Sequence, residues 1–93
     1  MNPRQLKDNQ ELFEYLVWLS DELDFRGNSK IAENVRTATR FASGSASEFL
    51  DEAEAVLKNI KTDYSSLLSE TELSDIESVI RQIQVAFKKI GGA

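Results

Sequence analysis

Residues 73–90 read LSDIESVIRQIQVAFKKI, and their pattern decides the fold. Apolar side chains recur in this stretch at alternating spacings of three and four: Leu73, Ile76, Ile80, Ile83, Phe87 and Ile90. Such spacing places the apolar side chains in one stripe along a helix and is typical of the seam between antiparallel helices in a bundle. Acidic residues precede the stripe and Lys88 and Lys89 close it, an order that the helix dipole favours. The stretch therefore predicts a helix over 72–90.

Three further segments carry a helical period, so we also expect helices over 9–26, 29–43 and 46–68. Their apolar stripes are Leu12, Leu16, Leu19 and Leu23 in the first, Ile31, Val35, Ala38 and Ala42 in the second, and Ala46, Phe49, Leu50, Ala53, Val56, Leu57 and Ile60 in the third. Gly27 and Gly44 follow the first two segments and suit the position just past a helix end. Because the link between these two segments is so short, we expect antiparallel neighbours.

Several residue pairs have the spacing of a capping box, in which one residue caps the helix and a Glu three positions later bonds back. They are Asp8 with Glu11, Ser45 with Glu48, Ser69 with Glu72, and Ser74 with Glu77. The first two pairs predict where the first and third helices begin. Either of the last two pairs suits the start of the fourth helix.

The third predicted helix contains a polar stretch, 61–66, that would suit a break. At about 100° per residue, Leu67 and Leu68 return to the directions of Phe49 and Leu50. A break has no reason to preserve this phase, so the pattern predicts one unbroken helix that runs through Tyr64 to about Leu68.

Together these segments predict an all-α fold, an antiparallel up-and-down four-helix bundle that forms a single domain over 1–93. We expect residues 1–7 and 91–93 to be tails. The expected core consists of Leu16, Leu19, Ile31, Val35, Phe49, Val56, Ile60, Ile76, Ile80, Ile83 and Phe87.

The composition narrows the chemistry. The chain of 93 residues has no Cys and no His, which removes disulfides, thiolate nucleophiles, imidazole bases and metal sites built on either residue. Neither Gly27 nor Gly44 belongs to a phosphate-binding loop, since no Gly-Lys-Ser or Gly-Lys-Thr follows. The acidic residues lie off the apolar stripes, where water should solvate them. We therefore expect no enzyme activity, no cofactor and no bound metal.

The charge and hydropathy of the chain predict its cellular location and disfavour some classes of partner. Sixteen acidic residues against eleven basic ones give a net charge of −5. Phosphates of nucleic acids and anionic membranes repel such a surface. The longest apolar run, 16–19, is far shorter than a membrane span, and the N-terminal residues do not read as a signal peptide. We expect a cytoplasmic protein that binds no membrane.

The far side of the first helix is the most informative candidate site. With Leu12 at zero, Trp18 falls at about 240° around the helix, well away from the core stripe. Glu11, Glu14 and Glu22 surround it, and Tyr15 lies between this face and the core. Trp and Tyr are frequent interface anchors, and carboxylates around them favour a basic partner. These residues form the candidate partner-binding set.

Three interpretations of this face stay open. In the first, residues 3–7 or a loop of the same chain cover Trp18. In the second, Trp18 forms a homodimer contact, which like charges oppose. In the third, it docks a different, basic protein. In size, charge and class the chain resembles small acidic bundles that serve as immunity proteins, inhibitors, antitoxins or adaptors. We therefore expect a non-catalytic protein that binds another protein.

A basic cluster on the second helix supports an alternative function. Arg36 and Arg40 lie one turn apart on the side away from Ile31, and Arg26 and Lys30 flank the preceding turn. A nucleic-acid-associated regulator would use this side. The simpler interpretation is a solvated face on which Glu33 pairs with one of the two arginines. A helix-turn-helix also needs a turn, which the unbroken period does not supply.

Overall fold

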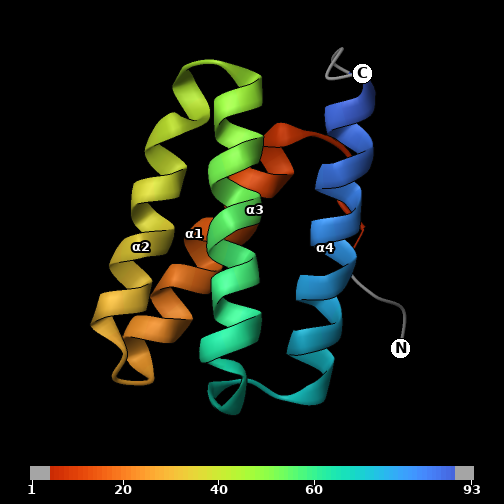
Figure 1. Cartoon of the computed structure of the whole chain (residues 1–93). Helices are drawn as coiled ribbons and strands as arrows, with labels where there is room; N and C mark the ends of the chain where they lie inside the picture. Colours follow the sequence, from red (N-terminus) through yellow and green to blue (C-terminus); the bar gives the residue numbers. More distant parts are fainter. Residues whose placement is uncertain (1–4, 90–93) are drawn as a thin grey trace.

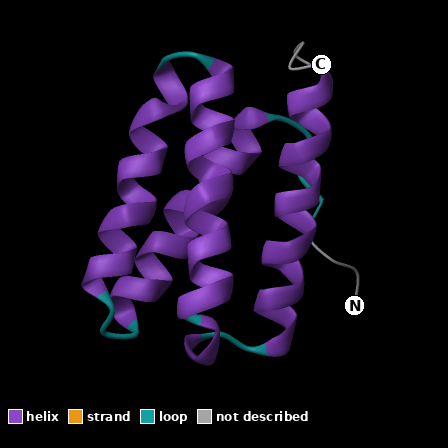
Figure 2. Ribbon diagram, in the orientation of Figure 1, coloured by secondary structure: helices purple, strands orange, loops and turns teal. Residues whose placement is uncertain are grey.

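The computed structural model describes residues 5–89 and is an up-and-down bundle of four α-helices (Figure 1). The helices are α1 (Asn9–Phe25), α2 (Ser29–Thr39), α3 (Ala46–Asp63) and α4 (Glu70–Lys89). Two short 3-10 helices, η1 (Arg40–Ser43) and η2 (Ser65–Leu67), lie in the connections. Over these residues the ribbon contains helices and loops without a strand (Figure 2). The predicted all-α fold is confirmed.

Successive helices run in opposite directions and pack against one another in sequence order. α1 runs obliquely from behind α3 to the lower end of α2, whereas α4 stands beside α3 (Figure 1). The short link between α1 and α2 makes them antiparallel neighbours, as the sequence predicts. The oblique path of α1 leaves one of its sides facing away from the bundle, and that side carries the candidate site.

α1 begins at a capping box. The Asp8 side chain accepts a hydrogen bond from the Glu11 backbone N–H at 3.0 Å. Glu11 Oε1 accepts from the Lys7 N–H at 2.8 Å, one residue before the expected partner. These bonds satisfy backbone donors that have no partner inside the helix. Ser45 caps α3 in the same way, with a longer bond of 3.5 Å from the Glu48 N–H.

α1 ends in a glycine turn. Gly27 has a φ of 84°, in the left-handed region that glycine adopts without a steric penalty. Its N–H donates to the Asp24 carbonyl, and the Asn28 N–H donates to the Leu23 carbonyl, both at 3.0 Å. This is the Schellman arrangement, which satisfies carbonyls in the last turn of the helix.

The second predicted helix, 29–43, is divided. α2 ends at Thr39, and the chain continues as η1 to Ser43. The Thr39 hydroxyl donates to the Arg36 carbonyl at 2.6 Å, the acceptor that an α-helix would offer to the Arg40 N–H. The Arg40 N–H turns instead to the Thr37 carbonyl, a 3-10 bond.

The prediction of one helix over 46–68 is wrong. α3 ends at Asp63, and Tyr64 leaves the helical region with φ −128° and ψ 18°. The tight turn η2 follows, and Leu68 is extended with φ −119° and ψ 150°. Leu67 and Leu68 still pack against the core from this connection. Their phase match therefore reflects burial of the connector and not continuation of the helix.

A complete capping box explains why the chain breaks before α4. The Glu72 N–H donates to Ser69 Oγ at 3.1 Å, and the Ser69 N–H donates to Glu72 Oε1 at 2.9 Å. Of the two caps that the sequence offers, this one opens the helix, so α4 begins at Glu70 and not at residue 72. Ile90 and the predicted tail residues 1–4 and 91–93 lie outside the described residues.

The core contains ten of the eleven residues expected there, and Phe87 is only partly buried. Ala42 and Ala46, at the ends of predicted stripes, are exposed. On α4 the sequence pattern misses Val79, which is fully buried. The buried side of α4 is wider than the predicted seam because the N-terminal segment packs along it, with Leu6 against the core.

Candidate functional site

The side of α1 that faces away from the bundle carries both apolar and acidic residues. We call it the outer face and define it by residues that are all exposed: Glu14, Val17, Trp18, Asp21, Asp24 and Phe25. Val17 is 38% exposed, Trp18 42% and Phe25 89%. In the described part of the chain the remaining large exposed apolar side chain is Val85, on α4. Exposed apolar surface is therefore concentrated on one helix.

Trp18 lies on the outer face as the sequence predicts, whereas Tyr15, which the sequence places between this face and the core, belongs to the core. Tyr15 is buried, and its ring stacks on the Trp18 ring with centroids 6.1 Å apart and planes inclined by 26°. Stacking of this kind holds an aromatic ring in one orientation. Tyr15 is thus a core residue that supports Trp18 from beneath, and it offers no surface of its own to a partner.

The three predicted glutamates have different environments. Glu14 is exposed and accepts a hydrogen bond from Gln10 Nε2 at 3.2 Å. Glu11 is half-buried and belongs to the helix cap. Glu22 is half-buried and forms an ion pair with Arg26 at 3.0 Å. Of the three, Glu14 is the one that lies on the outer face.

The sequence-based search missed Phe25. It lies seven residues after Trp18, so the two side chains fall within about 20° of each other around the helix. Phe25 lies next to the helix end between two charged residues, so it does not continue an apolar stripe. The spacing of seven from Trp18 is the signal that would have found it.

The outer face is acidic. α1 contains five carboxylates, Glu11, Glu14, Asp21, Glu22 and Asp24, and no Lys or Arg. Arg36 of α2 approaches from one flank and bonds to Asp21 Oδ1 and Asp24 Oδ2, both at 3.3 Å. The hydrogen bond that Arg36 donates to Asp21 raises the pKa of Arg36. One guanidinium shared between two carboxylates leaves this flank negative.

The end of α1 is fixed by Arg26. Its guanidinium bonds to both oxygens of Glu72, at 2.9 and 2.7 Å, and to the Leu67 carbonyl at 3.0 Å. The bidentate bond from Arg26 and the bond from the Ser69 N–H lower the pKa of Glu72 to about 2. This network joins the last turn of α1 to the start of α4, so Phe25 projects from a firmly held helix end.

The basic side of α2 consists largely of paired residues. Arg40 bonds to Glu33 at 3.1 Å, which confirms that Glu33 pairs with one of the two arginines. Arg36 is held by α1. Lys30, at the start of α2, is exposed and forms no ion pair with any residue the structure describes.

Comparisons with protein-family models, with curated proteins and with solved structures find no match to this chain. Within residues 5–89, no three acidic residues gather in a way that could hold a metal ion. Over the same residues, none of the helices combines the length and the apolar character needed to cross a bilayer.

Proposed function

We propose that this chain is a non-catalytic protein-binding domain whose outer face docks a basic partner protein. One observation carries the proposal: the helix with most of the exposed apolar surface also has five carboxylates and no basic residue. Immunity proteins, inhibitors, antitoxins and adaptors are the functional types that such a domain would serve. A cytoplasmic location is part of the same proposal.

The chemistry of the outer face supports a protein partner. Large apolar side chains that water surrounds gain free energy when a partner covers them. The Trp18 ring stacks on Tyr15, and the backbone at Phe25 belongs to a fixed helix end, so docking needs little rearrangement of the helix. The partner surface should therefore present two apolar pockets, spaced to receive residues two helical turns apart.

The charge of the outer face supports a basic partner and opposes a second copy. Two copies that met through this face would bring like carboxylates together. A partner rich in Lys and Arg would instead pair with Glu14 and compete with Arg36 for Asp21 and Asp24. Rim charges of this kind act mainly on the association rate, which falls as salt rises.

Affinity capture with matched baits tests the proposal. The wild type, Trp18→Ala, Phe25→Ala and Val85→Ala would each be immobilised and exposed to a lysate of the organism that encodes the chain. We expect a protein of high isoelectric point on the wild type and on Val85→Ala, and its loss from the other two baits. Titration of the purified partner should show at least about 30-fold weaker binding to Trp18→Ala. Retention by all four baits would contradict the proposal.

The same experiment separates the two alternatives. Sedimentation of the wild type alone would reveal a concentration-dependent dimer, and abolition of that dimer by Trp18→Ala would assign the outer face to self-association. Nucleic acid on the bait, released by replacing Arg36 and Arg40 with Gln, would assign the function to the basic side of α2. The ion pairs of both arginines with carboxylates speak against this second alternative.

A further inference from the structure

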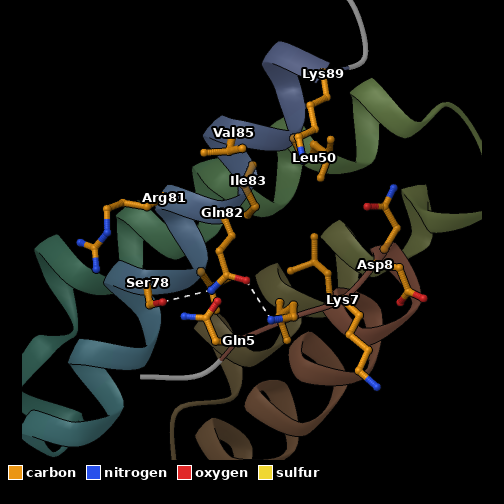
Figure 3. A pocket seen from close by; sticks show the side chains of 15 residues that line it. Gln5, Lys7, Asp8, Leu50, Ser78, Arg81, Gln82, Ile83, Val85 and Lys89 are labelled. Carbon is orange, nitrogen blue, oxygen red and sulfur yellow. Dashed lines mark hydrogen bonds between the residues drawn. The ribbon is translucent and has the colours of Figure 1, made fainter. Parts of the chain in front are cut away.

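A groove of about 540 Å³ lies between the N-terminal segment and the second half of α4 (Figure 3). Its floor consists of core side chains that are almost fully covered, Leu12, Leu50, Val79 and Ile83, and its apolar edges are formed by Leu6, Val85 and Ala86. Known small-molecule sites are about 300–1,000 Å³ and are lined mostly by apolar side chains with a few polar groups. The groove therefore has the size of a ligand site, with polar side chains in about half of its lining.

Gln82 holds the N-terminal segment along one wall of the groove. Its Oε1 accepts a hydrogen bond from the Leu6 N–H at 2.8 Å, and its Nε2 donates to Ser78 Oγ at 3.0 Å (Figure 3). The two bonds fix the amide between the segment and α4. This wall is therefore formed by the folded chain before any ligand arrives.

The groove has a positive rim in a chain whose net charge is −5. Lys7, Arg81 and Lys89 line it, and none of the three forms an ion pair with a residue the structure describes. Asp8 is the one acidic residue of the lining, and it accepts the hydrogen bond that caps α1. Elsewhere in the described chain, Lys30 and Lys88 also form no ion pair, whereas five cations are held by nearby carboxylates: Arg26, Arg36, Arg40, Lys58 and Lys61.

The three cations differ in how they lie. Lys89 and Leu50 both line the groove and are drawn at the same end of it, whereas Lys7 and Arg81 point outward from its edges (Figure 3). An ammonium group at the end of an apolar groove complements a molecule that carries an anionic group at the end of an apolar chain. Arg81 interacts electrostatically with Glu77, and Lys7 points outward, so we assign the anionic group to Lys89.

We propose that this groove binds a single-chain anionic amphiphile, with its apolar chain on the lining and its carboxylate at Lys89. The inference goes beyond protein binding by the outer face. The groove contains Leu12, whereas Trp18 lies at about 240° from Leu12 around α1, so the two surfaces are separate.

Calorimetric titration of the full chain with octanoate, decanoate and octanol, each as monomers in solution, tests the proposal. Decanoate has two more methylenes than octanoate and should bind about tenfold more tightly, since each methylene adds a similar increment. Octanol, which has the same chain length as octanoate but no charge, should bind more weakly than octanoate. Equal affinity for all three probes would overturn the proposal.

Two variants of the same charge locate the site. Lys89 lines the groove and Lys88, its neighbour, is exposed without lining it. Both lie in the last turn of α4, so Lys89→Glu and Lys88→Glu change the net charge and the helix end alike. We expect Lys89→Glu to weaken decanoate binding at least about tenfold, and Lys88→Glu less than about threefold.

Equal loss in the two variants would show adsorption by net charge and would overturn the proposal. The proposal would also be overturned if vesicles of anionic lipid bound the wild type and dissolved decanoate did not. Phe25→Ala should bind decanoate as the wild type does. Failure of the outer face to capture a protein would therefore leave this inference untouched. Failure of the groove to bind decanoate would likewise leave the proposed docking face untouched.

Discussion

Large apolar side chains lie on both sides of α1, on the inner face that packs against the other helices and on the outer face. The core of the bundle contains only those of the inner face. Leu12, Leu16, Leu19 and Leu23 are buried against the other helices. Val17, Trp18 and Phe25 lie outside on the same helix. A helix that only closes a bundle needs one apolar stripe and a polar remainder. The bundle therefore does not need the second apolar surface of α1, and the proposed docking would use it.

The largest expected effect belongs to the inner face. Leu16→Ala should lower the free energy of unfolding by about 2–5 kcal/mol, because Leu16 is fully buried and its truncation leaves a cavity. Denaturant unfolding of the purified variant measures this. A change below about 1 kcal/mol would show that the inner face does not hold the bundle together.

The next effect concerns the ion pair that fixes the end of α1. Glu72→Gln should lower the free energy of unfolding at pH 7 by about 1–2 kcal/mol, a value reduced by partial exposure of the pair. Glu70→Gln is the matched control, since Glu70 is exposed in the same first turn and makes no such bond with the described residues. Equal effects of the two substitutions would contradict the assigned role of Arg26.

The same carboxylate predicts a pH dependence. The pKa of Glu72 is about 2 in the folded chain against an ordinary value of 4.5. Its contribution to stability is therefore complete above about pH 4.5 and is lost as the pH falls through about 2. Denaturant unfolding of the wild type and of Glu72→Gln between pH 7 and pH 2 should give curves that converge at low pH. A constant difference across this range would show that Arg26 does not lower the pKa of Glu72.

Trp18→Ala should have a smaller effect on folding. The side chain is 42% exposed, and its loss removes the stacking on Tyr15, which contributes about 1 kcal/mol. Thermal unfolding of the variant alone, without any partner, checks this. A fall in stability of 3–5 kcal/mol, of the size expected for a core aromatic, would assign Trp18 to the core and remove it from the proposed docking face.

The sequence predicts the bundle well because its helices follow an apolar period and their caps are short-range signals. Asp8, Ser45 and Ser69 lie at helix starts, and Gly27 ends α1 as expected. Each of these features depends on residues within one or two turns of one another. Local patterns of this kind depend little on how the rest of the chain folds.

The errors come from contacts between distant residues. Leu67 and Leu68 keep the phase of α3 although the helix has ended, because the connector folds back onto the core. Phe87 is partly buried where the pattern placed it in the core, while the N-terminal segment covers the neighbouring side of α4. The periodicity of one helix carries no information about which distant segment packs on it.

Part of the candidate site could be predicted, because that part depends on local spacing along α1. Trp18 and Glu14 follow from their angles around α1. The burial of Tyr15 depends on which side of α1 the other helices cover, and the periodicity of α1 does not give this. The bond between Arg26 and Glu72 joins residues that are far apart in the chain, so only the structure reveals it.

Phe25 gives the most direct test that the outer face binds a partner, because its side chain is 89% exposed and contributes little to the fold. The measurement is the affinity of Phe25→Ala for the captured basic partner, with thermal unfolding of the same sample. We predict a change in the free energy of unfolding within about 0.5 kcal/mol and binding at least about tenfold weaker than the wild type. Unchanged affinity in a stably folded Phe25→Ala would contradict the proposed docking face.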